Sequence, residues 1–260
     1  MDAELLLAFV LGTSRTALLT VDGVPDDAAA RFAALLDQRA DRVPLQHLTG
    51  RAPFRHLELA VGPGVFVPRP ETEALVGWAL ERLAGLDEPV VVDLGSGSGA
   101  IALSIAHEHP GARVHAVEHD PVAIEWTRTN AAGSTVEVLA GDMTDPALLR
   151  DLDGTVDLVV SNPPYVPDGA RVPREVADHD PPLALWGGPD GLDVVRGLLR
   201  TAARLLRPGG WLGIEHADQQ GTSLPALVRA HGGFTDVADH PDLAGRPRFT
   251  TAQRAQAPNA

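Results

Sequence analysis

The chain has 260 residues, no cysteine, and a formal net charge of −14 from 21 lysines and arginines against 35 aspartates and glutamates. This length suffices for one α/β core with a small appendage, and the missing cysteine excludes disulfides, thiolate nucleophiles and zinc–thiolate sites. The acidic balance disfavours a protein whose main task is to grip the phosphate backbone of a nucleic acid.

The amino terminus reads MDAELLLAFVLG and carries Asp2 and Glu4 where a signal peptide would carry basic residues. No apolar stretch approaches the roughly 18 to 20 residues that a membrane-spanning helix needs. We therefore expect a soluble, cytoplasmic protein that has no contact with a membrane, and the lack of cysteine is compatible with a reducing compartment.

Two helical segments open the chain. DAELLLAFVL and PDDAAARFAALLDQRAD both place apolar residues at helical spacing. The second segment begins at Pro25 and carries Asp26 and Asp27 in its first turn, where the helix dipole favours negative charge. These patterns predict a small helical domain over residues 1–48.

A β-hairpin is expected to connect this domain to the rest of the chain over residues 49–68. Residues 57–61 alternate between apolar and less apolar side chains, and the glycine–proline–glycine sequence at 62–64 is typical of a turn. The apolar residues 65–67 would then form the returning arm of the hairpin.

From about residue 70 onward, strand patterns alternate with helix patterns. The strands are expected at 90–94, 113–118, 136–139, 156–161 and 210–215, and the helices at 71–84, 98–109, 121–131, 190–206 and 218–231. Such alternation predicts right-handed crossovers and a mostly parallel sheet covered by helices on both faces. The tail segments GFTDVADH and RPRFTTAQRA add two strands without a helix between them, which is typical of an antiparallel hairpin at a sheet edge. The predicted fold class is α/β, with a doubly wound, Rossmann-like sheet of seven strands in residues 69–260.

A glycine-rich turn follows the first of these strands in the sequence VVVDLGSGSGAIALSIA. The residues of the turn are Gly95, Ser96, Gly97, Ser98 and Gly99. Glycine allows the backbone to turn sharply and to approach a ligand closely, while the next helix directs its positive end to the same place. About 20 residues later Glu118 ends the next strand, where its carboxylate could accept both hydroxyls of a ribose. Since Gly95, Gly97 and Ala100 also satisfy the G-x-G-x-x-G/A fingerprint, a nicotinamide-dependent oxidoreductase stays open at this point.

The next strand, TVEVLAGDM, ends in Asp142 and Met143. Asp142 is suitably placed to accept a hydrogen bond from an adenine amino group, and Met143 could pack on the base, which favours S-adenosylmethionine as the cofactor. An aspartate after Gly141 is equally typical of a simple turn, so both interpretations are kept.

The fourth strand ends in Asn162, Pro163, Pro164 and Tyr165. The prolines stop the strand because they cannot donate to a sheet ladder. This leaves a polar and an aromatic side chain at the carboxyl end of a strand, where open α/β sheets bind ligands. N-P-P-Y at this position resembles the amino-group methyltransferases that act on planar nitrogens, either adenine N6 or the side-chain amide of glutamine.

The chemistry of a planar nitrogen suits these residues. The lone pair of such a nitrogen is delocalised, so the nitrogen is a poor nucleophile. If the Asn162 side-chain oxygen and the Pro163 carbonyl each accept one N–H, the lone pair faces the sulfonium methyl, and positioning with preorganised dipoles supplies most of the catalysis. Tyr165 offers a flat face for the amide or base. No metal is required, and the ten histidines present no convincing ligand set.

Further segments bear on which nitrogen is the substrate. These segments are HLTGRAPF, FVPRPETEALV, NPPYVP, HDPPLALWGGPDGLDVVRGLL, LRPGGWLGIEHADQQG and DLAGRPRFTTAQR. In this order they resemble the N5-glutamine methyltransferases that modify peptide chain release factors, and the resemblance spans nearly the whole chain. It implies that residues 95–99 and Glu118 bind S-adenosylmethionine and that Asn162 lies between cofactor and substrate. It also implies that residues 163–165 contact the glutamine of the GGQ loop, and that the helical domain binds the release factor.

The chain departs from this family at two places. The family commonly has an aromatic residue where Met143 stands, so we expect the adenine to pack on a thioether and the cofactor affinity to be lower. Family members usually carry a further helix before the segment that resembles DAELLLAFVLG, so the helical domain would be incomplete if the natural start lies upstream. We also expect a monomer without direct contact to nucleic acid.

Three alternatives stay open. An adenine N6-methyltransferase would share the glycine turn and N-P-P-Y, but the acidic charge and the lack of a basic target-recognition domain disfavour it. A nicotinamide-dependent oxidoreductase would leave residues 162–165 without a role, and a non-enzymatic cofactor-binding scaffold is not excluded by motifs alone. The segment DHDPP at 178–182 fits either a cover over the substrate mouth or a solvated acidic loop.

Overall fold

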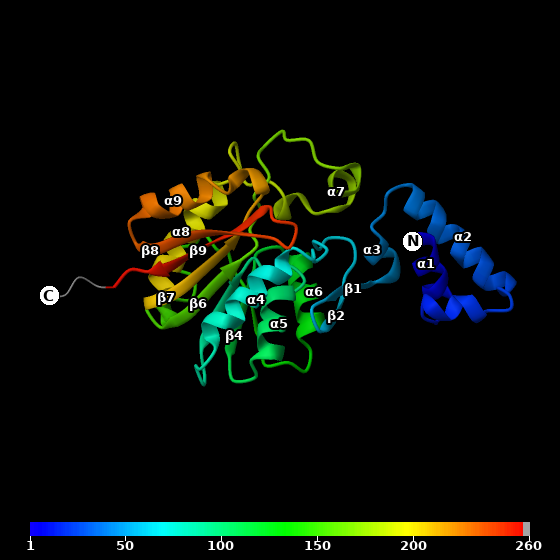
Figure 1. The fold of residues 1–260 in the computed structure, drawn as a ribbon, viewed down its shortest axis with the longest axis horizontal. Helices are drawn as coiled ribbons and strands as arrows, with labels where there is room; N and C mark the ends of the chain where they lie inside the picture. The colour runs from blue at the N-terminus through cyan, green and yellow to red at the C-terminus, as the bar shows by residue number, and fades with distance from the viewer. Residues whose placement is uncertain (257–260) are drawn as a thin grey trace.

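A seven-stranded β-sheet forms the centre of the computed structural model, which describes residues 1–256 (Figure 1). Its strands are β3 (Val90–Leu94), β4 (Arg113–Glu118), β5 (Glu137–Ala140), β6 (Val156–Ser161), β7 (Leu206–Glu215), β8 (Phe234–Pro241) and β9 (Pro247–Arg254). They lie in the order β5-β4-β3-β6-β7-β9-β8, with parallel pairing from β5 to β7 and antiparallel pairing of β9 with both β7 and β8. The predicted fold class is confirmed, including the terminal antiparallel hairpin.

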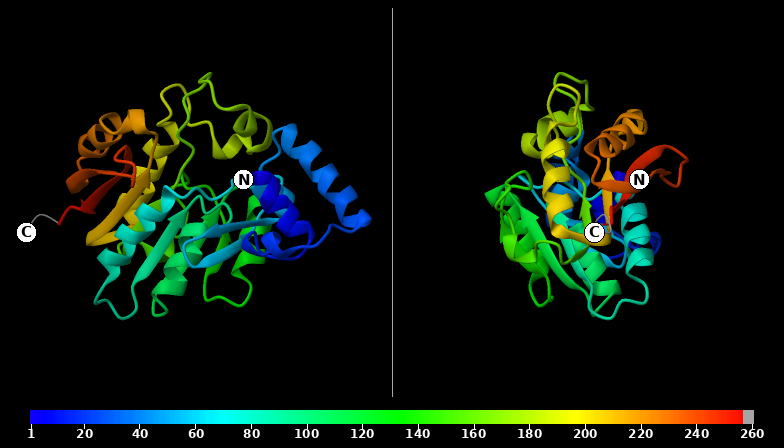
Figure 2. Two further views of the ribbon diagram at one scale, coloured as in Figure 1. Left: turned by 45° about the vertical axis from the view of Figure 1, so that its right-hand side comes forward. Right: turned by 90° about the vertical axis from the view of Figure 1, so that its left-hand side faces the viewer.

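Helices cover both faces of the sheet (Figures 1 and 2). They are α4 (Thr72–Leu83), α5 (Ala100–Glu108) and α6 (Pro121–Ala131) on one face, and α8 (Asp193–Leu205) and α9 (Ser223–His231) on the other. Val91 and Leu158 pack in the core on the α4 and α5 face, whereas their neighbours Val92 and Val159 pack in the core with α8 and α9. Burial of both faces explains why these strands read as continuous apolar runs in the sequence.

The boundaries of the carboxyl-terminal elements differ from the prediction in two places. The segment predicted as one helix over 218–231 consists of a short 3₁₀ helix, Asp218–Gln220, followed by α9. Strand β7 begins at Leu206 and not at residue 210, because a register shift lets the chain bulge between Leu206 and Trp211. Gly209 has φ +79° within this bulge, a conformation that glycine adopts without strain.

The predicted hairpin connector exists, but the prediction of its arms is wrong. The paired strands are β1 (Arg51–Phe54) and β2 (Leu57–Ala60), joined by a turn in which Arg55 has φ +50°. The glycines at 62 and 64 serve a different purpose, because a Cβ on Gly62 would lie 2.7 Å from Trp126 and one on Gly64 would lie 2.5 Å from Val122. These glycines allow the chain to pack closely against α6.

The amino-terminal helices stand to one side of the sheet, next to the hairpin (Figure 1). They are α1 (Asp2–Val10), a 3₁₀ helix (Thr16–Thr20), α2 (Asp26–Ala40) and the short α3 (Leu45–Thr49). Arg39 of α2 pairs with Asp2 at 2.8 Å and with Glu175 at 2.7 Å, and Glu175 belongs to α7 (Arg174–His179) in the loop region after β6. This ion pair links the helical domain to the segment that follows N-P-P-Y. Within residues 1–256, none of the helices combines the length and apolar character that crossing a membrane requires.

Candidate active site

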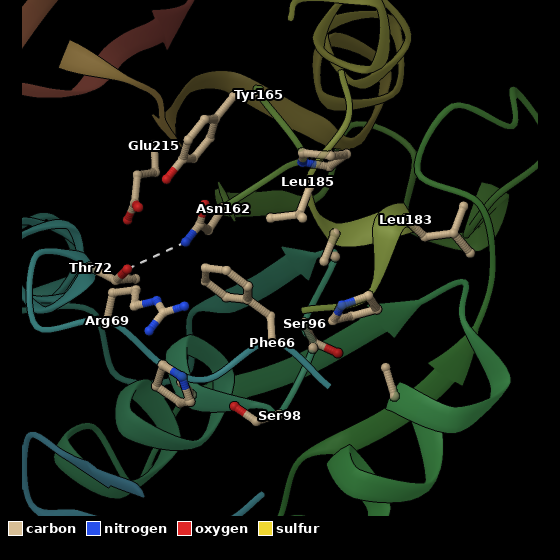
Figure 3. Close-up of a pocket in the computed structure, with 18 of the residues that line it drawn as sticks. Phe66, Arg69, Thr72, Ser96, Ser98, Asn162, Tyr165, Leu183, Leu185 and Glu215 are labelled. Atoms are coloured by element: carbon tan, nitrogen blue, oxygen red, sulfur yellow. Dashed lines mark hydrogen bonds between the residues drawn. The ribbon is translucent and has the colours of Figure 1, made fainter. Parts of the chain in front are cut away.

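A cavity of about 630 Å³ opens at the carboxyl ends of the parallel strands (Figure 3). Its walls come from segments 66–72, 95–101, 118–123, 142–144, 162–166 and 172–185, together with Glu215 and Arg248. The volume is that of a small-molecule site, and the position is the one at which open α/β sheets bind their ligands. The cavity therefore brings together the segments that the sequence singled out separately.

The glycine turn after β3 forms the cofactor end of the cavity. The N–H groups of Gly95 and Ser96 both donate to the Val117 carbonyl, at 2.8 and 3.0 Å, which ties the turn to β4. Gly97 lines the cavity with φ +56°, and a Cβ added there would meet no atom within 4 Å. The turn thus leaves open space where a ligand can approach the backbone. Gly99 precedes α5 and is not part of the wall, whereas Ser98 is.

Glu118 at the end of β4 fixes the shape of this turn. Its Oε2 accepts the Gly97 N–H at 2.8 Å, and its Oε1 accepts the N–H groups of His119 and Asp120 at 2.7 and 2.9 Å. A carboxylate offers roughly four acceptor positions, so these three bonds leave about one for a ribose hydroxyl. Glu118 both organises the backbone and presents an acceptor to the cavity.

Asp142 and Met143 lie together on the wall after β5. The Asp142 Oδ1 accepts hydrogen bonds from the Thr144 N–H and hydroxyl, at 2.7 and 2.8 Å, as in a turn. Burial would raise the pKa of Asp142, but the hydrogen bonds from Thr144 outweigh it and lower the pKa. The Met143 methyl group lies against the turn, 2.7 Å from the position of a Cβ on Gly95. Asp142 is therefore a turn aspartate that is also available to a ligand.

These residues fit S-adenosylmethionine. The cavity offers an acceptor for the ribose at Glu118, an acceptor for the adenine at Asp142, an apolar thioether at Met143 and open space at Gly97. Its acidic wall also suits a ligand that carries a positive charge.

The N-P-P-Y segment follows β6, the neighbour of β3 in the sheet, and forms the wall beside the glycine turn. Asn162 lines the wall and donates from its Nδ2 to the Thr72 Oγ1 at 3.3 Å (Figure 3). Pro164 and Tyr165 also line the wall, whereas Pro163 is buried behind it. Burial, together with the nearby Glu215 carboxylate, raises the pKa of Tyr165, so its hydroxyl stays protonated.

Neighbouring loops hold the N-P-P-Y segment in place. The Val166 N–H donates to the Leu185 carbonyl at 2.8 Å, and the Gln220 side chain donates to the Tyr165 carbonyl at 3.1 Å. A Cβ on Gly187 would lie 2.6 Å from the Pro164 carbonyl, so glycine is what lets the two backbones pack this closely. The segments WGGPDG and ADQQ thereby supply a rigid support for the loop, as preorganised catalysis requires.

The cavity also contains residues to which the sequence analysis assigned no role. Arg69 donates to Asp180 at 2.8 Å, and its guanidinium lies 4.7 Å from the centre of the Phe66 ring. Asp180 is buried, and burial raises its pKa although Arg69 opposes this effect. Pro181 is the one residue of DHDPP that lines the cavity, together with Leu183, Ala184 and Leu185 after it, while Asp178 and Pro182 are exposed.

Glu215 at the end of β7 is the second such residue. It is 1% exposed and lines the cavity, and Arg248 of the antiparallel strand β9 lines the same wall. Burial raises the pKa of Glu215 to about 7, while Thr72, Arg248 and Asn162 act in the opposite direction. A charged residue that ends a buried strand at the ligand-binding edge is the signal that could have identified it.

Comparisons with known proteins give consistent matches. The family model described as the methyltransferase small domain matches residues 62–178, and the one described as the PrmC N-terminal domain matches residues 1–50. The chain is 55% identical to the release factor glutamine methyltransferase of Streptomyces coelicolor, across 98% of this chain and 90% of that protein. It is 54% identical to the protein of the same name from Mycolicibacterium smegmatis, across 97% and 90%. Among solved structures, the T. thermophilus 16S rRNA N2 G1207 methyltransferase shares the fold, with a TM-score of 0.56 and 23% identity across 78% of this chain and 49% of that one.

Proposed function

The chain belongs to the family of release factor glutamine methyltransferases, and we propose that it methylates the glutamine of the GGQ loop in a peptide chain release factor. The methyl group comes from S-adenosyl-L-methionine and goes to the side-chain amide nitrogen, N5. The observation that carries this proposal is the position of Asn162, which lines one cavity together with Gly97 and Glu118.

The reaction forms a nitrogen–carbon bond, breaks the sulfur–carbon bond of the cofactor and releases one amide proton to solvent. Asn162 accepts one N–H of the substrate amide through its side-chain oxygen. Pro163 is buried behind the wall, and we propose that its main-chain carbonyl accepts the other N–H once the substrate is bound. Two fixed acceptors orient the lone pair of the nitrogen, and this orientation supplies most of the rate enhancement. Tyr165 provides a flat, half-buried surface for the planar amide, and Pro164 contacts the substrate beside it.

We propose a separate role for each of three consecutive regions of the chain. Residues 1–48 bind the release factor, residues 49–68 connect, and residues 69–260 bind the cofactor and catalyse the transfer. The helical domain presents apolar side chains to solvent, with Phe9 46% and Leu19 89% exposed, as a surface that binds a protein would. We also propose that the enzyme acts as a monomer in the cytoplasm, where translation takes place.

An adenine N6-methyltransferase would use the same N-P-P-Y arrangement. The net charge of −14 disfavours it, because a nucleic-acid substrate would be repelled. A nicotinamide-dependent oxidoreductase would use the glycine turn but would give Asn162 no task.

The test is a comparison of substrates with labelled S-adenosylmethionine. We expect the purified protein to label a release factor and to leave DNA and RNA unlabelled, and mass spectrometry should locate one added methyl group on the GGQ glutamine. A release factor with alanine in place of that glutamine is the matched control and should stay unlabelled. Label on nucleic acid, or none on any substrate, would refute the proposal.

A further inference from the structure

We propose that Thr72 and Glu215 are positioning residues that hold the Asn162 side chain with its oxygen, and not its NH2 group, facing the substrate. The inference rests on the proposed function, because it concerns how the same cavity binds the NH2 group of a glutamine side chain. It also gives a task to two segments, PETE and GIEH, whose role the sequence left open.

Three segments that are distant in the sequence meet at this point. Thr72 lies in the first turn of α4 and is 3% exposed, Glu215 ends β7 and is 1% exposed, and Asn162 follows β6. The Asn162 Nδ2 donates to the Thr72 hydroxyl oxygen at 3.3 Å. Figure 3 shows the Glu215 carboxylate, the Asn162 amide and the Thr72 hydroxyl turned toward one another at one end of the cavity.

The chemistry of the Glu215 carboxylate and the Thr72 hydroxyl decides which of the three side chains donates each hydrogen bond. An ionised carboxylate can only accept hydrogen bonds, and a threonine hydroxyl has a single proton to donate. Side-chain hydrogen bonds from Thr72 and from Asn162 both favour the ionised form of Glu215. A Thr72 hydroxyl that donates its proton to this carboxylate has only lone pairs to offer to Asn162. The Asn162 side chain must then donate from its NH2 group, which leaves its oxygen for the cavity.

Without this order the Asn162 amide has no fixed orientation. The two ends of an asparagine amide have the same shape, and only the hydrogen-bond network distinguishes them. A flipped Asn162 would place its own NH2 group against the NH2 group of the substrate, where no hydrogen bond can form. The substrate nitrogen would lose one of its two acceptors.

The surroundings of Glu215 make this arrangement sensitive to pH. The charges of Arg248 from β9 and of Glu71 before α4 act on the pKa of this carboxylate, and Glu215 in turn acts on the pKa of Tyr165 from the loop after β6. Burial raises the pKa of Glu215 to about 7, and its Oε2 has no hydrogen-bond partner within the described residues. Once protonated, Glu215 can donate to Thr72, and the order of donors can reverse. Methyl transfer should therefore weaken as the pH falls through this range.

The test measures kcat for methylation of a release factor by the wild-type enzyme and by variants that change one side chain with little change in its shape. Thr72→Val and Glu215→Gln are expected to lower kcat about 10-fold to 100-fold, as removal of an outer-shell partner typically does, with cofactor affinity by calorimetry unchanged. Thr72→Ser keeps the hydroxyl and should keep kcat close to wild type. In the wild-type enzyme, kcat/KM for S-adenosylmethionine should fall as the pH drops below about 7. In Glu215→Gln this pH step should be absent.

Thr201→Val is the matched control for removal of a buried hydroxyl. Thr201 lies in α8, is 1% exposed and has a hydroxyl without a partner within the described residues, so kcat should not change. The inference would be overturned if Thr72→Val and Glu215→Gln kept wild-type kcat, if Thr72→Ser were as slow as Thr72→Val, or if Glu215→Gln kept the pH step.

A separate measurement distinguishes failure of this inference from failure of the proposed function. A wild-type enzyme that methylates no release factor would refute the function. The side-chain NH2 signals of Asn162 in an NMR spectrum would still decide the inference, because they should move in Thr72→Val and stay in place in Thr201→Val. Unmoved signals in Thr72→Val would refute it.

Discussion

The cofactor end and the substrate end of the cavity are built in different ways. At the cofactor end, one contiguous turn and the Glu118 carboxylate satisfy each other through three backbone hydrogen bonds. At the substrate end, side chains such as Thr72, Asn162 and Glu215 arrive from different segments, and Glu215 keeps an oxygen without a partner within residues 1–256. A binding site that is formed by one short stretch of backbone can be predicted from the sequence. A binding site that is formed by side chains from distant segments becomes visible only in the structure.

A buried carboxylate whose pKa is raised to about 7 lies near the glycine turn, and another lies near Asn162. Asp93 on β3 lies beneath the glycine turn, outside the cavity wall, and accepts the Ala102 N–H at 3.1 Å. Glu215 lies in the wall itself. Burial is the main cause of the raised pKa in both cases. The two carboxylates differ because Glu215 lies where a bound substrate can reach it and Asp93 does not.

Replacement of Asn162 by alanine tests the comparison most strongly. The variant loses one preorganised acceptor at the reacting nitrogen, so we expect kcat to fall by about 10² to 10³. Cofactor affinity should change little, because the turn and Glu118 are intact. Single-turnover methylation and calorimetry measure the two quantities, and a large loss of cofactor affinity would mean that the two ends are not separable.

Replacement of Asp93 by asparagine tests the buried carboxylate at the cofactor end. The folded pKa of about 7 lies above the ordinary value of 3.8, so the folded protein keeps a proton that the unfolded chain loses between these values. The free energy of unfolding should therefore fall as the pH rises from about 4 to about 7 and level off above. The uncharged amide of Asp93→Asn mimics the protonated carboxyl and should stabilise the protein at pH 8 by on the order of 1 to 4 kcal/mol.

Chemical denaturation at several pH values measures this stabilisation. The gain should shrink toward pH 5, where the wild-type carboxyl is itself protonated. A variant that is less stable than wild type at pH 8 would show that the Asp93 charge is required by the fold.

Replacement of Glu118 by alanine is expected to weaken cofactor binding and to leave kcat nearly unchanged, whereas Asn162→Ala should do the reverse. Three backbone N–H groups lose their acceptor, and hydrogen bonds to a charged group contribute about 1.5 to 3 kcal/mol each. We expect the dissociation constant of S-adenosylmethionine to rise about 10-fold to 100-fold, while kcat at saturating cofactor stays close to wild type. Glu125→Ala on the exposed surface of α6 is the control, and a kcat loss as large as that of Asn162→Ala would contradict the comparison.

The smallest effect is expected from Met143→Phe. An aromatic ring on the adenine contributes about 0.5 to 1.5 kcal/mol more than apolar contact alone, so cofactor affinity should rise about 2-fold to 10-fold. The ring must fit beside Gly95, against which the Met143 methyl already packs. Calorimetry decides between a gain in affinity and a loss caused by crowding at this glycine.

The parts of the molecule that could be predicted are those whose physical cause is local. Strands β3, β4 and β6 match their predicted ranges because burial on both faces makes them continuous apolar runs. The glycine turn and the ends of these strands were placed correctly because parallel strands bring their carboxyl ends to one edge.

The parts that could not be predicted depend on contacts between distant segments. The glycines at 62 and 64 suggested a turn, but their cause is close packing against Trp126 and Val122 of α6. Thr72 fits the first turn of a helix and Glu215 the end of a strand, so neither pattern indicates that both face Asn162. Arg248 reaches the cavity only because β9 pairs with β7.

The insertion of β9 between β7 and β8 also affects how the chain matures during translation. While a ribosome is still making residues 247–254, β7 has an unpaired edge and the cavity lacks the wall that carries Arg248. A nascent chain at that stage can already form the glycine turn and the parallel strands, yet it exposes a template for aggregation. A chain that stops before residue 247 would lack both the strand that pairs with β7 and the Arg248 side chain in the cavity wall, so we expect it to be inactive.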